Sequence, residues 1–240
     1  MVRESGGVRV QPRWLIVAVV ALFAAILPVV TAPPAISARV SGAIVEYDFD
    51  EQTGTKIGNS GAAGSALDLT IDTPGTVAWI PGGGISVTGE ADIISDNAAS
   101  AISTAVKASG EITMEAWVKP DQTFIPGTLL PHRIVSMELN HTNTNFTLGQ
   151  DDDTYEARLR TTTVGPDGQP ELLAGLPASS LQHVVYTCTE GGTDNAKMYV
   201  NGSLAGSATI GGDVSTWDDS YFLYLANAAA GARTFLGDFC

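Results

Sequence analysis

Positively charged side chains are scarce in this sequence of 240 residues. It has 12 lysines and arginines against 26 aspartates and glutamates, a formal net charge of −14 at pH 7. Because nucleic-acid binding relies on clustered lysine and arginine, this composition excludes nucleic acid as a partner. The same deficit disfavours anionic membrane surfaces. The acidic side chains favour solubility, and their oxygens are the ligands that calcium prefers.

Cysteine and histidine are also few. Cys188 and Cys240 are the only cysteines. In an oxidising compartment they can pair, and closing a loop of that length stabilises a protein by about 4 kcal/mol. Spacing alone does not bring their Cα atoms within bridging distance, so we favour two separate buried thiols. His132, His141 and His183 do not lie at zinc-ligand spacing from cysteine or acidic residues, and we interpret His183 as a structural residue.

No charge interrupts the 17-residue apolar run over residues 14–30. Three arginines precede this run and small residues follow it up to Ala38, which is the order of a secretory signal peptide. We therefore expect residues 1–38 to be removed. An uncleaved anchor is the alternative, because 17 residues are at the lower limit for spanning a bilayer. The protein is expected in the medium or at the cell surface, touching a membrane only if this segment is retained.

A hairpin signal organises the second half of the chain. Strand-like runs at residues 183–189 and 197–200 are followed by Asn201-Gly202 and a third run at residues 203–210. Asn-Gly between two such runs predicts a type I′ turn, which needs positive φ at both central residues. The sequence therefore predicts three consecutive antiparallel strands here.

Short alternating segments separated by turn residues fill the rest of the chain. Apolar and acidic side chains alternate over residues 43–49, as in a half-buried strand. Further strands are expected at residues 67–71, 77–80, 85–87, 112–118, 133–139, 146–150, 155–161 and 221–226. One short connector helix is expected, with Ser95 or Asp96 as its cap and Gly110 at its end. This pattern predicts an all-β fold, an antiparallel two-sheet sandwich with one helix.

Four stretches resemble the laminin-G-like, concanavalin A-like jelly-roll domains of secreted and cell-surface proteins. They are YDFDE (residues 47–51), ITMEAWVKP (112–120), HVVY (183–186) and MYVNG (198–202). Their order and spacing extend the resemblance over almost all of residues 42–240. It implies a jelly-roll domain over residues 39–240 that lacks a late strand, since the sequence stops at Cys240 within the family's strand. An open sheet edge is expected there.

The acidic opening segment has a pattern found in laminarinase-type glycoside hydrolases, which share this sandwich. Glu46, Asp48 and Glu51 have the spacing Glu-x-Asp-x-x-Glu. On a strand, alternate carboxylates line one face and can flank a glycosidic bond. In those hydrolases, however, the catalytic strand lies mid-domain on the concave sheet. We therefore expect no enzymatic activity, and glycan hydrolysis by these three residues is the alternative.

Calcium is the cofactor that the resemblance implies, because many such sandwiches hold one calcium ion at the rim. Asp151, Asp152 and Asp153 form a compact acidic turn, and Asp48 and Asp50 are further candidates. Their spacing does not match a twelve-residue calcium loop. A solvated acidic turn is the alternative.

Carbohydrate binding requires exposed aromatic rings beside polar loops. Trp217 and Tyr221 are the best candidates because residues 218–220 mark a loop, Trp79 is a third, and Trp117 is expected in the core. We predict a non-catalytic binding or adhesion module whose partner is a glycan, bound through rim loops, or a surface protein. A glycan-cleaving enzyme on the same sandwich and a structural spacer domain are the alternatives.

Overall fold

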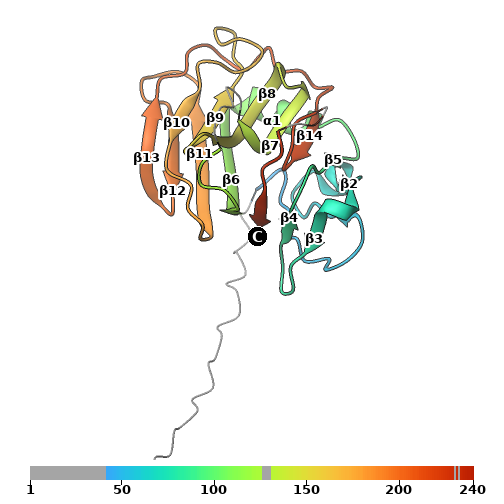
Figure 1. Ribbon diagram of the computed structural model, residues 1–240. Coiled ribbons are helices and arrows are strands. Elements are labelled where there is room, and N and C mark those ends of the chain that lie inside the picture. Colours follow the sequence, from blue (N-terminus) through green and yellow to red (C-terminus); the bar gives the residue numbers. More distant parts are fainter. Residues whose placement is uncertain (1–41, 126–130, 230, 232) are drawn as a thin grey trace, which may run out of the picture. The chain divides into compact units, whose positions relative to one another are not determined.

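The structure, a computed structural model, describes residues 42–125, 131–229, 231 and 233–240 (Figure 1). By its internal contacts the chain divides into two units, residues 1–36 and 37–240, and all described residues belong to the second. The predicted signal peptide, residues 1–38, lies outside the described residues. Within the described ranges, no helix is long and apolar enough to cross a membrane.

Two antiparallel sheets face each other in the domain (Figure 1). The larger sheet has the order β1 (Lys56–Ile57), β2 (Leu69–Ile71), β5 (Ile93–Ser95), β14 (Phe222–Leu225), β7 (His132–Asn140), β8 (Asn143–Asp151), β9 (Thr154–Leu159) and β10 (Leu172–Ala174). The smaller sheet has the order β13 (Ser203–Ala208), β12 (Ala196–Val200), β11 (Gln182–Thr189), β6 (Glu111–Pro120), β15 (Gly237–Phe239), β4 (Ile85–Val87) and β3 (Val77–Trp79). Helix α1 (Ser100–Ser109) connects β5 to β6. The prediction of an all-β antiparallel sandwich with one connector helix is confirmed.

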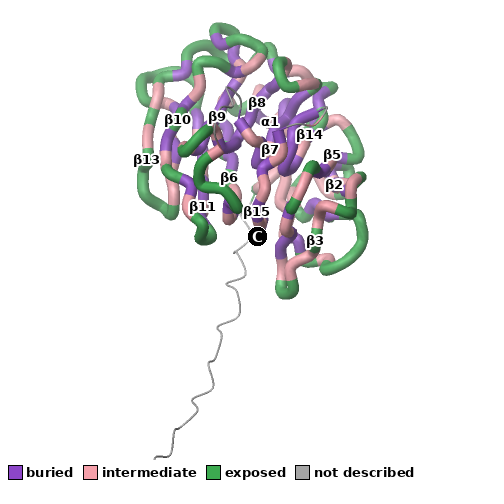
Figure 2. The backbone as a smooth tube through the Cα atoms, in the orientation of Figure 1, coloured by how far each residue is buried: buried purple, intermediate pink, exposed green. Residues whose placement is uncertain are grey.

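The hydrophobic core lies between the two sheets, because every second side chain of a strand points to the same face. Met137 of β7 and Leu148 of β8 contribute to it from the larger sheet, and Val184 of β11 and Met198 of β12 from the smaller. All four side chains are fully buried. Figure 2 shows buried residues gathered on the central strands and exposed residues in the connecting loops.

The predicted Asn-Gly hairpin is confirmed. Asn201 and Gly202 have φ values of 52° and 76° and connect β12 to β13, with Val200 paired to Ser203. Asn201 also binds β11: its Oδ1 accepts from the His183 N–H at 2.9 Å, and its own N–H donates to the His183 carbonyl at 2.8 Å. The turn therefore helps to fix the register of three neighbouring strands.

Helix α1 ends where the sequence predicts and begins later. Gly110 has a φ of 67°, and its N–H donates to the Val106 carbonyl at 2.8 Å. The predicted cap is wrong, because Ser95 belongs to β5 and its Oγ accepts from the Leu223 N–H at 3.0 Å. Ala99 precedes the first turn without a side-chain cap. Pairing of β5 with β14 therefore takes Ser95 away from the helix.

The strand predicted over residues 43–49 is not formed. This segment has one isolated bridge, between Tyr47 and Asn59. Phe49 and Gln52 have positive φ values of 52° and 62°, which take the chain out of the extended region. Strands β1, β5 and β10 are absent from the sequence prediction.

The last strand, β15, lies inside the smaller sheet. Phe239 pairs with Ile85 of β4 on one side and with Val118 of β6 on the other. The outermost strands are β13 and β3 in the smaller sheet and β1 and β10 in the larger. The open edge expected beside the last strand is therefore not found at β15.

Candidate functional site

Strand β6 exposes a tryptophan on the outer face of the smaller sheet. Ile112, Met114 and Val118 are buried in the core, so the intervening Glu115 and Trp117 point away from it. Trp117 is 38% exposed. The prediction that Trp117 packs in the core is therefore wrong, because Trp117 occupies one of the alternate positions of β6 whose side chains point outward.

The Trp117 ring is held by its cross-strand neighbour. Trp117 and His183 are register partners on β6 and β11, and their rings stack with centroids 4.5 Å apart and an interplanar angle of 12°. His183 Nε2 lies 2.8 Å from Glu115 Oε1 on β6. The backbone of His183 is fixed by its two hydrogen bonds with Asn201. These contacts set the orientation of an exposed aromatic ring before any ligand arrives.

Polar and apolar side chains surround this ring on the same face. Lys119 Nζ lies 3.0 Å from Asp238 Oδ2, and this hydrogen bond raises the pKa of Lys119. Tyr199 of β12 lies in the next cross-strand row, paired with Val185 of β11. Two strand spacings place it roughly 10 Å from the β6 row. Trp117, His183, Glu115 and Tyr199 are called the Trp117 platform below.

Two of the three rings predicted to bind sugar are buried. Trp217 and Tyr221 are only 3% and 5% exposed. The Trp217 ring lies 5.8 Å from that of Phe146, and its Nε1–H donates to the Arg160 carbonyl at 2.8 Å. These two rings form part of the core and present no exposed face to a sugar. Trp79 is half-buried, and a binding role for it stays a prediction.

The aspartates predicted to hold calcium do not converge. Within the described ranges, no three His, Cys, Asp or Glu side chains form a group that would hold a metal ion. Burial raises the pKa of Asp151. Asp152 forms the turn with a φ of 47°, Asp50 is exposed, and Asp48 Oδ2 accepts from a serine hydroxyl at 2.9 Å. As they lie, these residues and Asp153 do not fit the six to eight oxygen ligands of calcium, which stays a prediction.

The acidic trio that matches the hydrolase pattern is not on a strand. Glu51 Oε1 accepts from the Gly58 N–H at 2.6 Å, which fixes it to the following loop. Asp48 Oδ2 is bonded to Ser60 Oγ. Without an extended strand, Glu46, Asp48 and Glu51 lack the alternation that would bring them to one face.

The two cysteines are separate, as favoured from the sequence, but the prediction that both thiols are buried is wrong for Cys240. Cys188 is buried in β11, where its cross-strand register partner is Ile112 of β6. Cys240 is exposed and follows β15, where its N–H donates to the Trp117 carbonyl at 3.0 Å. Burial raises the pKa of the Cys188 thiol.

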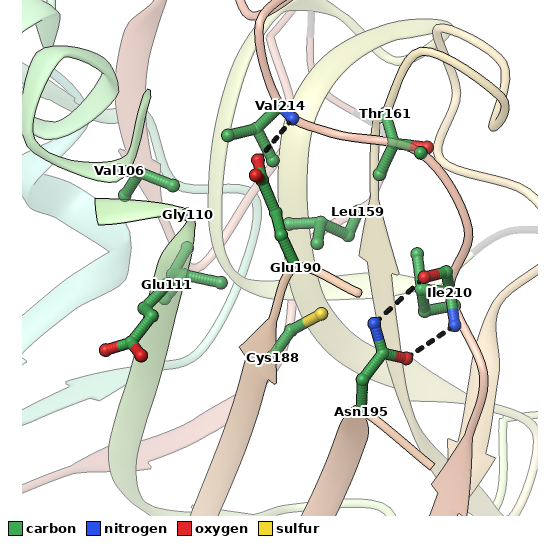
Figure 3. A pocket seen from close by; sticks show the side chains of 12 residues that line it. Val106, Gly110, Glu111, Leu159, Thr161, Cys188, Glu190, Asn195, Ile210 and Val214 are labelled. Atoms are coloured by element: carbon green, nitrogen blue, oxygen red, sulfur yellow. Dashed lines mark hydrogen bonds between the residues drawn. The ribbon is translucent and has the colours of Figure 1, made fainter. Parts of the chain in front are cut away.

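A small cavity beside Cys188 is too small for a ligand (Figure 3). Its volume is about 10 Å³, the space of a single water molecule. Its polar side chains already have partners: Glu190 Oε1 accepts from the Val214 N–H at 2.8 Å, and Asn195 makes two hydrogen bonds with the backbone of Ile210 (Figure 3). We therefore assign no ligand to this cavity.

Comparison with protein families agrees with the architecture. Residues 95–240 match the family model described as the concanavalin A-like lectin/glucanases superfamily. The chain belongs to this superfamily. The resemblance seen in the sequence is confirmed, and a comparison with curated protein sequences gave no match.

Three solved structures illustrate the likeness of fold. The binding domain of botulinum neurotoxin serotype D/C has 9% identity and a TM-score of 0.54, covering 82% of this chain and 46% of its own. The binding domain of Paraclostridial Mosquitocidal Protein 1 has 11% identity and a TM-score of 0.53, covering 82% and 47%. Domain 4 of AbnA, an extracellular arabinanase from Geobacillus stearothermophilus, has 18% identity and a TM-score of 0.52, covering 82% and 88%. The chain spans about half the length of the two toxin binding domains.

Proposed function

We propose that this protein is a non-catalytic binding module that recognises carbohydrate through the Trp117 platform. The observation that carries the proposal is the exposed Trp117 ring, stacked on His183 and bordered by Glu115. An indole presents a broad apolar face to a sugar ring, and adjacent polar side chains bind its hydroxyl groups. Because the ring is already oriented, binding costs little side-chain entropy.

The extent of the platform favours an oligosaccharide over a single sugar. Tyr199 lies two strands from Trp117, roughly 10 Å away across the sheet. A chain of sugar rings that crosses β6, β11 and β12 contacts both aromatic side chains. Leu204, which is 57% exposed and pairs with Tyr199, continues the apolar surface onto β13.

The structural neighbours support a binding role through their fold alone. The two toxin structures are binding domains, and the arabinanase domain was solved in complex with arabinotriose. A role outside the cytoplasm follows from the signal-like N-terminal sequence. One fold hosts many functions, so the Trp117 platform carries the proposal.

Glycan-array screening of the protein, with and without calcium, tests the proposal. We expect binding to neutral oligosaccharides that the Trp117→Ala variant loses at least tenfold, because the exposed ring supplies the central apolar contact. Leu176→Ala is the matched control, since Leu176 is 67% exposed and does not belong to the platform. The Trp79→Ala variant tests the remaining ring predicted from the sequence.

Three outcomes contradict the proposal, and a fourth adds a cofactor to it. Binding that survives Trp117→Ala but is lost in Trp79→Ala moves the site to β3. Absence of glycan binding by a folded protein favours the structural spacer. Turnover of a bound glycan that is lost in Glu46→Gln, with the fold retained, restores the hydrolase alternative. Binding that requires calcium restores the predicted calcium site.

A further inference from the structure

A second group of polar side chains lies on the outer face of the larger sheet. Ser136, Thr147 and Arg158 are register partners across β7, β8 and β9, and they alternate with inward residues such as Met137 and Phe146. In the next row, Arg133 and Glu156 both pair with Gly149 of β8. We call these residues, together with Glu138 and Arg233, the polar cluster. Side chains on the outer face of a sheet are ordinarily exposed to solvent.

The polar cluster is nevertheless almost completely buried. The β7–β9 side chains of the cluster are at most 2% exposed, and Arg233 is 7% exposed. Residues 161–171, called the covering segment below, lie over Arg158. A Cβ added to Gly168 would come within 2.8 Å of Arg158 Cβ, and the Pro166 carbonyl accepts from the Thr144 N–H at 2.7 Å. The Arg233 carbonyl accepts from the Arg133 N–H at 2.9 Å, which brings a second segment onto the cluster.

The charges in this cluster are unevenly paired. Arg158 is hydrogen-bonded to Glu156, whereas Arg133 Nε lies 3.4 Å from Glu138 Oε2, which is long for a charge-assisted bond. Within the described residues, Arg233 forms no ion pair. Glu138 and Glu156 act electrostatically on both Arg133 and Arg233. The polar cluster nevertheless holds three arginines against two glutamates, which leaves an excess of positive charge.

Five buried atoms of the cluster have no hydrogen-bond partner in the part of the chain that the structure describes. They are Arg133 Nη2, Arg233 Nη1, Ser136 Oγ, Thr147 Oγ1 and Glu156 Oε2. A buried polar group without a partner is costly, and a buried guanidinium more so. The segments that cover the cluster therefore bury these five atoms without supplying hydrogen-bond partners for them.

The unsatisfied atoms specify the chemistry of a ligand. The guanidinium N–H groups of Arg133 and Arg233 require an acceptor, and a carboxylate matches their geometry and charge. The Ser136 and Thr147 hydroxyls and Glu156 Oε2 suit the hydroxyl groups of a polyol. Phosphate fits less well than a carboxylate, because its second negative charge would be repelled more strongly by the Glu138 carboxylate.

We propose that the polar cluster is a second binding site, for an acidic sugar whose carboxylate meets Arg133 and Arg233 and whose hydroxyls meet Ser136, Thr147 and Glu156. It is separate from the Trp117 platform, which lies on the other sheet. Access requires displacement of the covering segment. Gln169 of that segment, with its amide oxygen toward Arg158, accepts from Nη1 and Nη2 at 3.2 and 3.3 Å. This amide occupies a position that a ligand takes over.

Calorimetric titration of the full chain with digalacturonate tests the site, with the dimethyl ester of the same disaccharide as the uncharged probe. We expect digalacturonate to bind at least tenfold more tightly than the ester. Arg233→Gln removes the unpaired charge and is expected to weaken binding at least tenfold. Gln169→Ala removes the competing amide and is expected to strengthen binding severalfold. If the cluster has only a structural role, digalacturonate does not bind, and neither Arg233→Gln nor Gln169→Ala changes the titration.

Matched variants make the result specific. Arg160→Gln is the charge control, because Arg160 bonds Tyr221 Oη at 3.5 Å and does not belong to the cluster. If Arg233→Gln does not fold, Ser136→Ala serves instead, with an expected severalfold loss. Protection of residues 161–171 from hydrogen exchange is expected to change when digalacturonate binds.

The same titrations separate this site from the proposed function. Trp117→Ala is expected to leave digalacturonate binding unchanged while it weakens neutral-glycan binding at least tenfold. Loss of digalacturonate binding in Trp117→Ala but not in Arg233→Gln overturns the second site and leaves the platform intact. Equal binding of acid and ester, or no binding of either by the folded protein, also overturns it.

Discussion

Glu156 is a fully buried carboxyl group whose surroundings favour its neutral form. Burial raises the pKa of Glu156 to about 7, and the neighbouring Arg158 offsets only part of this effect. The folded protein therefore holds this proton more tightly than the unfolded chain does. The resulting stabilisation is complete below the ordinary glutamate pKa near 4.5 and is lost as the pH rises through about 7.

The Glu156→Gln variant tests this linkage. Because glutamine cannot ionise, the variant is expected to gain stability relative to the wild type between pH 5 and pH 8, by up to about 3 kcal/mol. Urea denaturation of both proteins at the two pH values measures the difference. Glu111→Gln, at an exposed position of β6, is the control and is expected to show no such trend. A pH-independent difference between wild type and Glu156→Gln contradicts the raised pKa.

At the scale of elements, the hairpin shows what local sequence does to the fold. Asn201 and Gly202 both adopt positive φ, and nothing lies within 4 Å of a Cβ added to Gly202. The need for glycine there is therefore a matter of backbone conformation and not of space. The same turn holds His183 on β11, so it also supports the stacked ring of Trp117.

The Gly202→Ala variant isolates that backbone cost. We expect a loss of about 1–2 kcal/mol in the free energy of unfolding, because a side chain is strained in the left-handed region. Thermal unfolding of the variant beside Gly75→Ala gives the comparison. Gly75 also has open space around an added Cβ but no positive φ. Equal stability of the two variants contradicts the type I′ explanation.

At the scale of the whole molecule, β15 joins segments that are far apart in sequence. It lies between β4 and β6 in the smaller sheet, and Phe239 on it is 2% exposed. The Phe239 ring meets that of Phe235 edge to face at 5.5 Å. Residues near both ends of the described range therefore contribute to one core.

Truncation of Phe239 is expected to destabilise the domain strongly. Phe239→Ala removes a buried ring and leaves a cavity, which costs about 3–5 kcal/mol. Chemical denaturation measures the change. Phe222→Ala is the matched control, because that ring is 37% exposed, and its cost is expected to be much smaller. Similar losses in the two variants contradict the central place of β15.

Much of the architecture follows from local patterns. Alternation in β6, β7, β8 and β11 and the Asn-Gly turn predict most of the strands, and Gly110 predicts the end of α1. The same alternation indicates that Trp117 is exposed, since Ile112, Met114 and Val118 are at the alternate positions that point into the core. Trp217 is different, because its burial depends on Phe146 and on a hydrogen bond to Arg160. Neither partner is close to it in sequence.

The sequence by itself determined the β-rich class of the domain, its hairpin and its family resemblance, because these depend on side-chain period and on the conformations of a few glycines and asparagines. Only the tertiary structure decided which rings are exposed and which charges are buried. Trp117 meets His183 across two strands, and Arg133, Arg158 and Arg233 act on one another electrostatically from three different segments. Such contacts depend on strand order and register, which no local pattern contains.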